Sequence, residues 1–343
     1  MMPAPEPTDG GHAATPPQSR FRSLGVPPDG FNPSTEPDSQ LTRYGLPTVD
    51  AMASNPKAAA FRRAFLQPLA DGRPLRFVPA LPTSSIAMDL FVIERTAPTT
   101  QPAQRSVNWS GGYLAARGGH RFVSVMADWV VPSVSVPPNP RATEYHSSTW
   151  IGIDGQKSYL DSSLPQIGTK QRCGEGLQGA REYYAWFQWW ARGQVTEEQP
   201  LGLPVNHGDT MSAIISVFDE RSVICNLRNV TQNVMLEAFR AWAPSPCRIS
   251  GATVEWIMER PSPPDSDGWE AYALPDYSPF AFTSCIAESS PLGGTTLHDR
   301  DLEGARLIRM YEIAANPPGT RTISTARRVL VPEQRLELAY VAP

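Results

Sequence analysis

Hydrophobic and polar side chains alternate over short segments from about residue 107 to the C-terminus, a pattern typical of half-buried β-strands. Strands are expected at residues 122–131, 142–154, 182–192, 210–218, 222–229, 234–242, 252–259, 277–286, 305–313 and 336–341. The chain also has 36 prolines and 25 glycines, which suit turns better than long helices. Because no long helical pattern separates the strands, we predict an all-β sandwich or barrel and exclude a parallel α/β fold.

The N-terminal part of the chain has a different texture. Residues 1 to about 50 are rich in Pro, Gly, Ser and Asp and contain few large apolar side chains. Such a segment buries too little surface to offset its ordering entropy, so we expect a disordered or loosely attached arm. Residues 57–67 predict a short helix, and two strand-like pieces follow before residue 95. We therefore divide the chain into a mostly irregular extension, residues 1–105, and a β-sandwich domain, residues 106–343.

Composition narrows the functional classes. Hydrophobic residues make up 41% and charged residues 19%, as expected of a globular protein with a sizeable core. The net charge of −4 provides no basic field, so we expect no nucleic-acid partner. No apolar run approaches the roughly 20 residues that a membrane-spanning helix needs, so no membrane partner is expected either. Residues 1–20 also lack the apolar stretch of a secretory signal.

The cysteines leave two states open. They contain no CxxC pair, which disfavours a zinc site, and they could form two disulfides or remain free thiols. The positions concerned are Cys173, Cys225, Cys247 and Cys285. The sequence also contains neither a GxSxG elbow nor an HExxH helix, which disfavours serine and metallopeptidase chemistry.

Three predicted strands each carry polar side chains on one face beside aromatic or small residues. In the first, Trp150, Gly152 and Asp154 share a face because side chains alternate along a strand, and Gly152 would leave room for a ligand. The other two sets are Tyr184, Trp186, Gln188 and Trp190, and Glu255, Ile257 and Glu259. Together these faces suggest a groove. The alternatives are that the tryptophans are core, that Asp154 is a turn residue, that the glutamates line a solvated edge, and that Gln166 belongs to a plain loop.

Five motifs in order resemble the glutamic peptidases, or eqolisins. They are Asn108-Trp109-Ser110-Gly111, Trp150-Ile151-Gly152-Ile153-Asp154-Gly155, Gln166-Ile167-Gly168-Thr169, Tyr184-Ala185-Trp186-Phe187-Gln188-Trp189 and Val254-Glu255-Trp256-Ile257-Met258-Glu259. The resemblance implies a sandwich of two antiparallel, lectin-like (concanavalin A-like) sheets. It also implies a monomeric, cofactor-free endopeptidase that acts on polypeptides at acid pH, resists pepstatin and is secreted. Family precursors carry a pro-segment, so the resemblance implies one in residues 1–105.

The resemblance also implies the site residues. Gln166 and Glu259 match the family's catalytic pair, although Pro165 is inserted before Gln166 and Ile167 stands where Thr is usual. Gln188 replaces a family Glu, which removes one carboxylate from the expected cleft and predicts a pH optimum less acidic than the family norm. The residues expected to surround the pair or line the substrate are Trp150, Asp154, Trp186, Gln188 and Glu255.

Two other functions stay open at this stage. A lectin-like sandwich without catalytic activity could bind carbohydrate or peptide in the same groove. A glycosidase would need two carboxyls about 5–5.5 Å or about 6.5–9.5 Å apart. Glu255 and Glu259 lie about 13 Å apart along one strand at ~3.3 Å per residue, which is too wide. Asp154 with Glu259 would serve only if their strands were neighbours.

Overall fold

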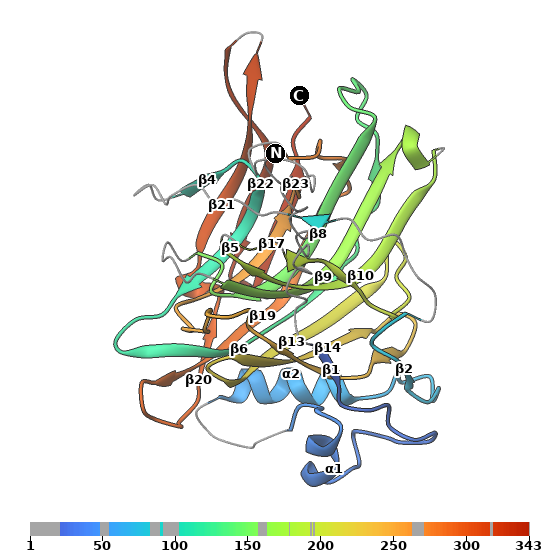
Figure 1. The fold of residues 1–343 in the computed structure, drawn as a ribbon, viewed down its shortest axis with the longest axis vertical. Helices are drawn as coiled ribbons and strands as arrows, with labels where there is room; N and C mark the ends of the chain where they lie inside the picture. Colours follow the sequence, from blue (N-terminus) through green and yellow to red (C-terminus); the bar gives the residue numbers. More distant parts are fainter. Residues whose placement is uncertain are drawn as a thin grey trace, which may run out of the picture.

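The structure is a computed structural model of the chain. It describes residues 21–48, 55–82, 90–91, 103–156, 163–177, 179–192, 194, 196–262, 271–315 and 318–342. Its core is a pair of large antiparallel sheets, which we call sheet I and sheet II (Figure 1). The prediction of an all-β sandwich is confirmed.

Sheet I carries the motif-bearing strands. Its order is β12 (Gln199–Pro200), β10 (Arg181–Ala191), β9 (Ser163–Gly174), β8 (Glu144–Ile153), β17 (Thr253–Glu259), β5 (Trp109–Ala115) and β21 (Arg306–Ala315). A short strand, β4 (Ala103–Ser106), runs parallel to β21. β8 therefore lies between β9 and β17, which positions the predicted catalytic strands one strand apart on either side of it.

Sheet II continues from sheet I through the β21–β22 pair. Its order is β22 (Pro318–Val329), β23 (Arg335–Tyr340), β19 (Phe280–Pro291), β6 (His120–Val130), β13 (Thr210–Asp219), β14 (Ser222–Asn229), β16 (Phe239–Trp242) and β1 (Phe21–Ser23). Side strands are β20 (His298–Asp301) on β19, β15 (Val234–Leu236) on β14, and β2 (Arg76–Val78) parallel to β15. The predicted strand 234–242 is thus two strands, because the chain leaves β15 before it pairs as β16.

Small elements complete the described structure. They are the pairs β3 (Leu90–Phe91) with β11 (Thr196–Glu197) and β7 (Val134–Ser135) with β18 (Asp276–Tyr277), the 3-10 turns η1 (Glu175–Leu177) and η2 (Leu302–Gly304), and the helices α1 (Asp38–Arg43) and α2 (Pro56–Leu66). α2 confirms the helix predicted at 57–67. None of the described helices has the length and apolar character needed to cross a membrane.

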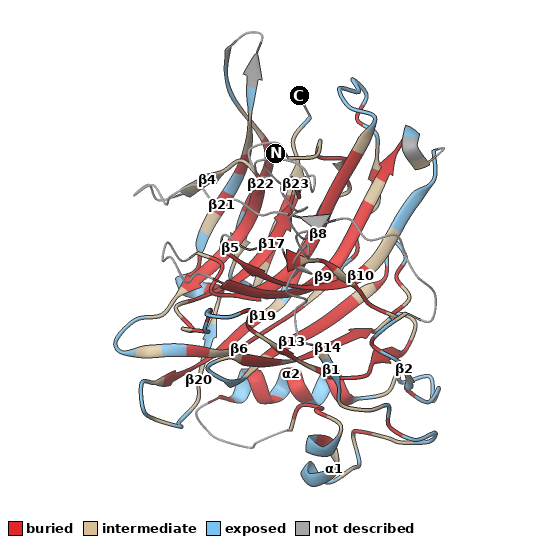
Figure 2. Ribbon diagram, in the orientation of Figure 1, coloured by how far each residue is buried: buried red, intermediate tan, exposed pale blue. Residues whose placement is uncertain are grey.

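Strand alternation separates the apolar side chains into three layers. The largest cluster fills the space between the sheets and includes Ile151 and Ile153 of β8, as the alternating pattern predicts. A second cluster lies between the helices and the outer face of sheet II. A third, with Trp109, Trp150 and Trp186, lies on the outer face of sheet I. Buried residues consequently extend through both sheets and beneath α2 (Figure 2).

The N-terminal extension packs on sheet II over residues 21–48 and 55–82, whereas the sequence predicted a loose arm for its first 50 residues. β1 pairs with β16, and Leu41 of α1 is buried in the second cluster. The composition did not predict this ordered packing, because a few apolar side chains are enough when they pack against the face of an existing sheet. Within the extension, residues 1–20, 49–54, 83–89 and 92–102 lie outside the described residues.

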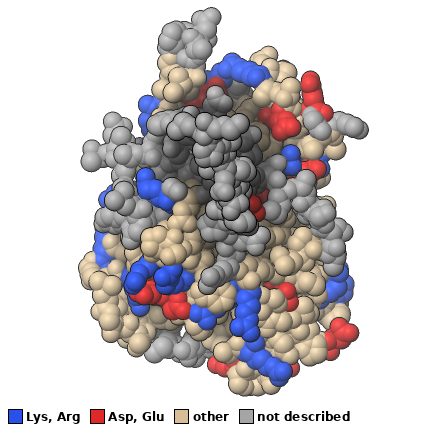
Figure 3. All heavy atoms as spheres, viewed as in Figure 1, with Lys and Arg blue, Asp and Glu red and all other residues tan. Residues whose placement is uncertain are grey.

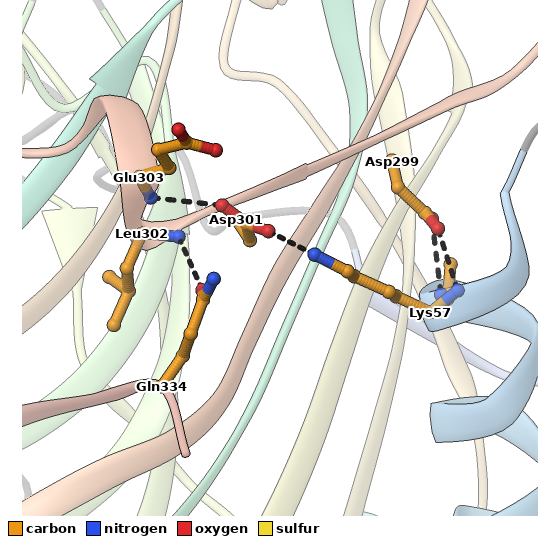
Figure 4. Close-up of polar contacts among 7 residues, drawn as sticks. Lys57, Asp299, Asp301, Leu302, Glu303 and Gln334 are labelled. Carbon is orange, nitrogen blue, oxygen red and sulfur yellow. Dashed lines mark hydrogen bonds and ion pairs between the residues drawn. The ribbon is translucent and has the colours of Figure 1, made fainter. Parts of the chain in front are cut away.

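Helix α2 is fixed to the sandwich by charged groups of sheet II. The Asp299 carboxylate accepts from the backbone N–H of Lys57 at 2.6 Å and of Ala58 at 3.1 Å, which satisfies the helix N-terminus in place of an N-cap side chain (Figure 4). The Lys57 ammonium pairs with Asp301. Arg62 forms an ion pair with the buried Glu288. These contacts orient the helix over the apolar cluster beneath it.

All four cysteines are buried free thiols in the structure, which decides the alternative that the sequence left open.

The surface charges show no segregation by sign in the view of Figure 3, where Lys and Arg are interspersed with Asp and Glu.

Candidate active site

The cross-strand register of sheet I brings the predicted site residues to its outer face. Gln166 on β9 is opposite Gly152 on β8, and Gly152 is opposite Glu255 on β17. Four residues before Gly152 on β8, Ser148 is opposite Glu259 on one side and Lys170 on the other. We call such a set of opposite residues a row. Because side chains two or four residues apart on a strand share a face, Gln166, Glu255 and Glu259 all lie on the face opposite the main core.

Glu259 is the most constrained group of this face. Its Oε1 accepts from Trp109 Nε1 at 3.0 Å and its Oε2 accepts from Trp150 Nε1 at 2.7 Å. The residue is 2% exposed. Burial raises the pKa of Glu259 to about 7, while the two indole donors and the Lys170 charge lower it and the Glu198 charge raises it further. A carboxyl with this pKa exchanges protons readily near neutral pH.

Gln166 is oriented by a chain of amide hydrogen bonds. The Thr196 carbonyl accepts from Gln188 Nε2 at 2.8 Å, and this fixes the Gln188 amide with its oxygen toward Gln166. Gln188 Oε1 then accepts from Gln166 Nε2 at 2.9 Å. Gln166 Oε1 is left as a buried acceptor with no partner among the described residues. Gln166 therefore presents an open oxygen and one remaining N–H on the same face as Glu259.

Gln166 and Glu259 are not hydrogen-bonded to each other. Trp150 stands between them, because it is two residues from Gly152, the partner of Gln166, and two from Ser148, the partner of Glu259. The Gln166 amide and the Glu259 carboxyl are therefore arranged on either side of the Trp150 indole.

Asp154 and Gly152, which the sequence placed in a ligand groove, have structural roles instead. Asp154 accepts from the Ser250 backbone N–H at 2.6 Å and from the Ala252 N–H at 2.7 Å, so it supports the loop before β17. Gly152 leaves room for protein, since a Cβ there would meet Leu164 Cδ1 at 2.6 Å. The space above Gly152 is therefore occupied by side chains of the sheet.

Glu255 and Trp186 lie on the predicted face. Glu255 is fully buried, and its Oε1 accepts from the Gln156 backbone N–H at 3.1 Å. Trp186 is 2% exposed, and its Nε1 has no partner among the residues that the structure describes. The predicted surroundings of the pair thus include one more indole donor beside Gln166.

Sequence reasoning missed the roles of Trp109, Thr196, Lys170 and Glu198. Trp109 was part of a recognised motif, but its distance in sequence concealed its bond to Glu259. Lys170 is fully buried and pairs with Glu198 at 3.1 Å. Lys170 lies four residues after Gln166 on the same strand, so the alternation of side chains could have placed its ammonium on the face of the site.

The arrangement defines a class of site in which two indole N–H groups hold the buried Glu259 carboxyl, and the neutral Gln166 amide lies on the same face. No group of three or more His, Cys, Asp or Glu side chains within the described ranges is arranged to hold a metal ion. The strands of Asp154 and Glu259 are neighbours, but Glu259 is opposite Ser148, six residues before Asp154, which is about 20 Å at ~3.3 Å per residue and too wide for a glycosidase pair.

Comparison with known proteins identifies this class. The model of the Peptidase A4 family matches residues 107–328, more than half of the chain, and the chain belongs to this family. It is 24% identical over 257 residues to aspergillopepsin-2 of Aspergillus niger, covering 70% of this chain and 82% of that protein. The family is that of the glutamic peptidases, and the chain is a glutamic-type endopeptidase.

Solved structures agree on the fold. Scytalido-glutamic peptidase with a transition state analog inhibitor superposes with a TM-score of 0.51 at 20% identity, covering 68% of this chain and 98% of that chain. A second structure of that peptidase, with a peptide-based transition state analog, gives a TM-score of 0.51 at 21% identity over the same shares. The sandwich of sheets I and II is therefore the fold of these peptidases.

Proposed function

We propose that Glu259 and Gln166 hydrolyse peptide bonds with an activated water. The observation that carries the assignment is the state of Glu259, a buried carboxyl held by two indole donors on the same face as an amide with an open oxygen. The family match supports the assignment, because both residues lie within residues 107–328.

The chemistry has two proton transfers. Ionised Glu259 takes a proton from water, and the hydroxide adds to the carbonyl carbon of the scissile bond. Glu259, now protonated, returns that proton to the amine nitrogen as the carbon–nitrogen bond breaks. The carboxyl is ready for the next cycle when the products leave.

Gln166 has the complementary task. Its Oε1 accepts a hydrogen bond from the attacking water, and its remaining N–H donates to the oxyanion that forms on the substrate. An aimed donor of this kind is typically worth about 3–4 kcal/mol in the transition state. Since an amide does not ionise, it raises no like-charge repulsion against Glu259. Gln188 and Thr196 hold the amide in this orientation.

The surrounding residues support the pair. Trp150 and Trp109 fix both oxygens of Glu259, and Trp186 offers a further N–H toward the substrate. Asp154 and Glu255 stabilise the turn and strand that carry the site. Because Glu259 must be ionised to act as the base, and burial holds its pKa at about 7, we propose a pH optimum less acidic than that of an acid-adapted peptidase.

The domain division follows from the same assignment. We propose residues 106–343 as the peptidase domain, which the family match over residues 107–328 supports. We keep the prediction that the extension is a pro-segment as a proposal about processing, to be tested by N-terminal sequencing after acid incubation. A monomeric, cofactor-free state and the absence of nucleic-acid partners stay predictions.

The test is hydrolysis of a denatured protein substrate by the purified chain across pH, with and without pepstatin and EDTA. Wild type is expected to cleave in the presence of both reagents. Gln166→Ala and Glu259→Ala are expected to lose activity while they keep the wild-type circular dichroism spectrum. Near-normal cleavage by either variant removes the assignment of that residue.

A further inference from the structure

We propose that Lys170 is a positioning residue whose buried ammonium holds Glu259 in its ionised form, and that Glu198 limits the strength of this effect. The inference rests on the proposed role of Glu259 as the base. The Lys170–Glu198 ion pair contributes charges to the site, whereas Gln166 and the indole donors are neutral.

The register places the two charges in one row of sheet I. Lys170 on β9 is opposite Ser148 on β8, and Ser148 is opposite Glu259 on β17. The side chains of a row share a face, so the ammonium and the carboxyl lie on the same outer face with one small residue between them. Lys170 and Glu259 are 0% and 2% exposed, and solvent therefore screens their interaction weakly.

A buried lysine needs a reason because desolvation of an ammonium is costly. Lys170 has an ionic partner in Glu198, at 3.1 Å, and the two side chains are 0% and 5% exposed. Glu198 lies in the connection between β11 and β12, and β11 also supplies the Thr196 carbonyl that orients Gln188. The same short segment thus holds both the amide of the site and the counter-charge of its cation.

Apart from Lys170, the residues in the row of Glu259 and next to it are aromatic or hydroxyl-bearing side chains. β5 contributes Trp109, β8 contributes Ser148 and Trp150, and β10 contributes Tyr184. On its own strand, Glu255 lies four residues away, and the next residue, Arg260, donates to the Val107 carbonyl at 2.8 Å.

Lys170 and Glu198 are accordingly the charges with the strongest influence on Glu259. The direction follows from Coulomb's law: the ammonium lowers the pKa of Glu259, and the Glu198 carboxylate raises it. Lys170 therefore extends the base form of Glu259 toward lower pH, and Glu198 reduces this extension.

The experiment compares pH profiles of kcat/KM for wild type, Lys170→Met, Glu198→Gln and the double variant, on one peptide substrate. Lys170→Met is expected to move the acidic limb to higher pH by about one unit, and Glu198→Gln to move it to lower pH by a similar amount. The double variant removes both charges and leaves neither partner of the ion pair buried alone, so its limb is expected close to the wild-type position. Thermal unfolding of each variant identifies losses that come from folding.

The outcomes separate this inference from the proposed function. A purely structural role of the ion pair would lower kcat/KM at every pH and leave the limb in place, which would overturn the inference. Opposite shifts in the two single variants would support it. Glu259→Ala is measured in the same assay: if that variant remains active, the proposed function itself fails, whereas inactive Glu259→Ala with an unmoved limb in Lys170→Met removes only the role of Lys170.

Discussion

Trp150 Nε1 donates a hydrogen bond to Glu259 Oε2 at 2.7 Å, across the β8–β17 pair. Trp109 serves the other oxygen from the opposite neighbour, β5, at 3.0 Å. The aromatic strands of this family member thus hold a carboxyl from both sides. This bond explains why a fully buried tryptophan belongs to the site without touching solvent.

Removal of the Trp150 donor tests this relationship. Trp150→Phe keeps most of the ring and deletes the bond to the carboxylate, so the ionised form of Glu259 loses about 1.5–3 kcal/mol of stabilisation. We expect kcat/KM near pH 6 to fall by about tenfold or more, with the acidic limb displaced to higher pH. Trp189→Phe is the matched control, because Trp189 belongs to the cluster between the sheets. Equal losses in the two variants would argue against a special role for Trp150.

The pH dependence of activity follows from the raised pKa of Glu259. The base form is present above a pKa of about 7 and is lost as the pH falls through it. We therefore expect kcat/KM to rise with pH and to show its acidic limb nearer neutrality than an acid-adapted peptidase would. Initial rates on one peptide substrate from strongly acidic to mildly alkaline pH decide the matter, and an optimum near the acidic end of that range would contradict the expectation.

Glu259 should also make the stability of the fold depend on pH, but stability should fall with rising pH where activity rises. The folded-state pKa of Glu259 is about 7 and its ordinary value is 4.5, so the folded chain binds more protons than the unfolded chain between these two values. Its contribution to the free energy of unfolding is therefore fully present below pH 4.5 and declines by up to roughly 3 kcal/mol as the pH rises to 7.

Urea unfolding of wild type and Glu259→Gln measures this contribution. The neutral amide cannot titrate, so the difference in unfolding free energy between the two proteins should change with pH in that window. A difference that stays constant from acidic to mildly alkaline pH would show that Glu259 does not titrate with a raised pKa.

Gln188 is expected to act through the orientation of Gln166. Gln188→Ala deletes both the acceptor for Gln166 Nε2 and the donor to the Thr196 carbonyl, so the Gln166 amide is no longer fixed. We expect kcat to fall by about 10²-fold, as for other misaligned transition-state donors, with a small change in KM. Gln188→Glu keeps the acceptor but opposes a carboxylate to the Thr196 carbonyl, so its kcat should fall between those of wild type and Gln188→Ala. An unchanged kcat in Gln188→Ala would show that Gln166 is held by other contacts.

The N-terminal extension is expected to stay with the sandwich after any cut. Phe65 of α2 is 2% exposed, and Arg228 of β14 donates to its carbonyl at 2.6 Å. Phe65→Ala should cost about 3–5 kcal/mol of unfolding free energy, measured by urea titration. Arg63 on the same helix is exposed, so Arg63→Ala is the matched surface control and should cost little. A loss of unfolding free energy in Phe65→Ala as small as that in Arg63→Ala would show that the Phe65 ring contributes no packing to the sandwich.

Acid incubation provides the processing test for the same segment. If the chain is cut near residue 100, the fragment with residues 21–82 should co-elute with the peptidase domain on size exclusion. Separate elution of a folded, active domain would instead show that the cut pro-segment is released. An uncut chain after acid incubation would count against processing.

Much of this protein was determined by local sequence. Alternation along each segment predicted the strands and the face of Ile151 and Ile153, because a strand with one face in a core must alternate. Helical spacing predicted α2. The ordered motifs, read as a resemblance, indicated Gln166 and Glu259, since side chains that share a face repeat at even spacing whatever their neighbours are.

The tertiary structure alone decided which distant groups meet. That Trp109 reaches Glu259 and that Glu198 reaches Lys170 depend on strand order and register, which long-range pairing fixes and local pattern does not encode. The same holds for the extension: its apolar residues are too sparse to predict an ordered layer, and only the outer face of sheet II gives them a surface to cover. The charge state of the site is likewise a tertiary property, because burial, two indoles and an ion pair from separate segments of the chain set it together.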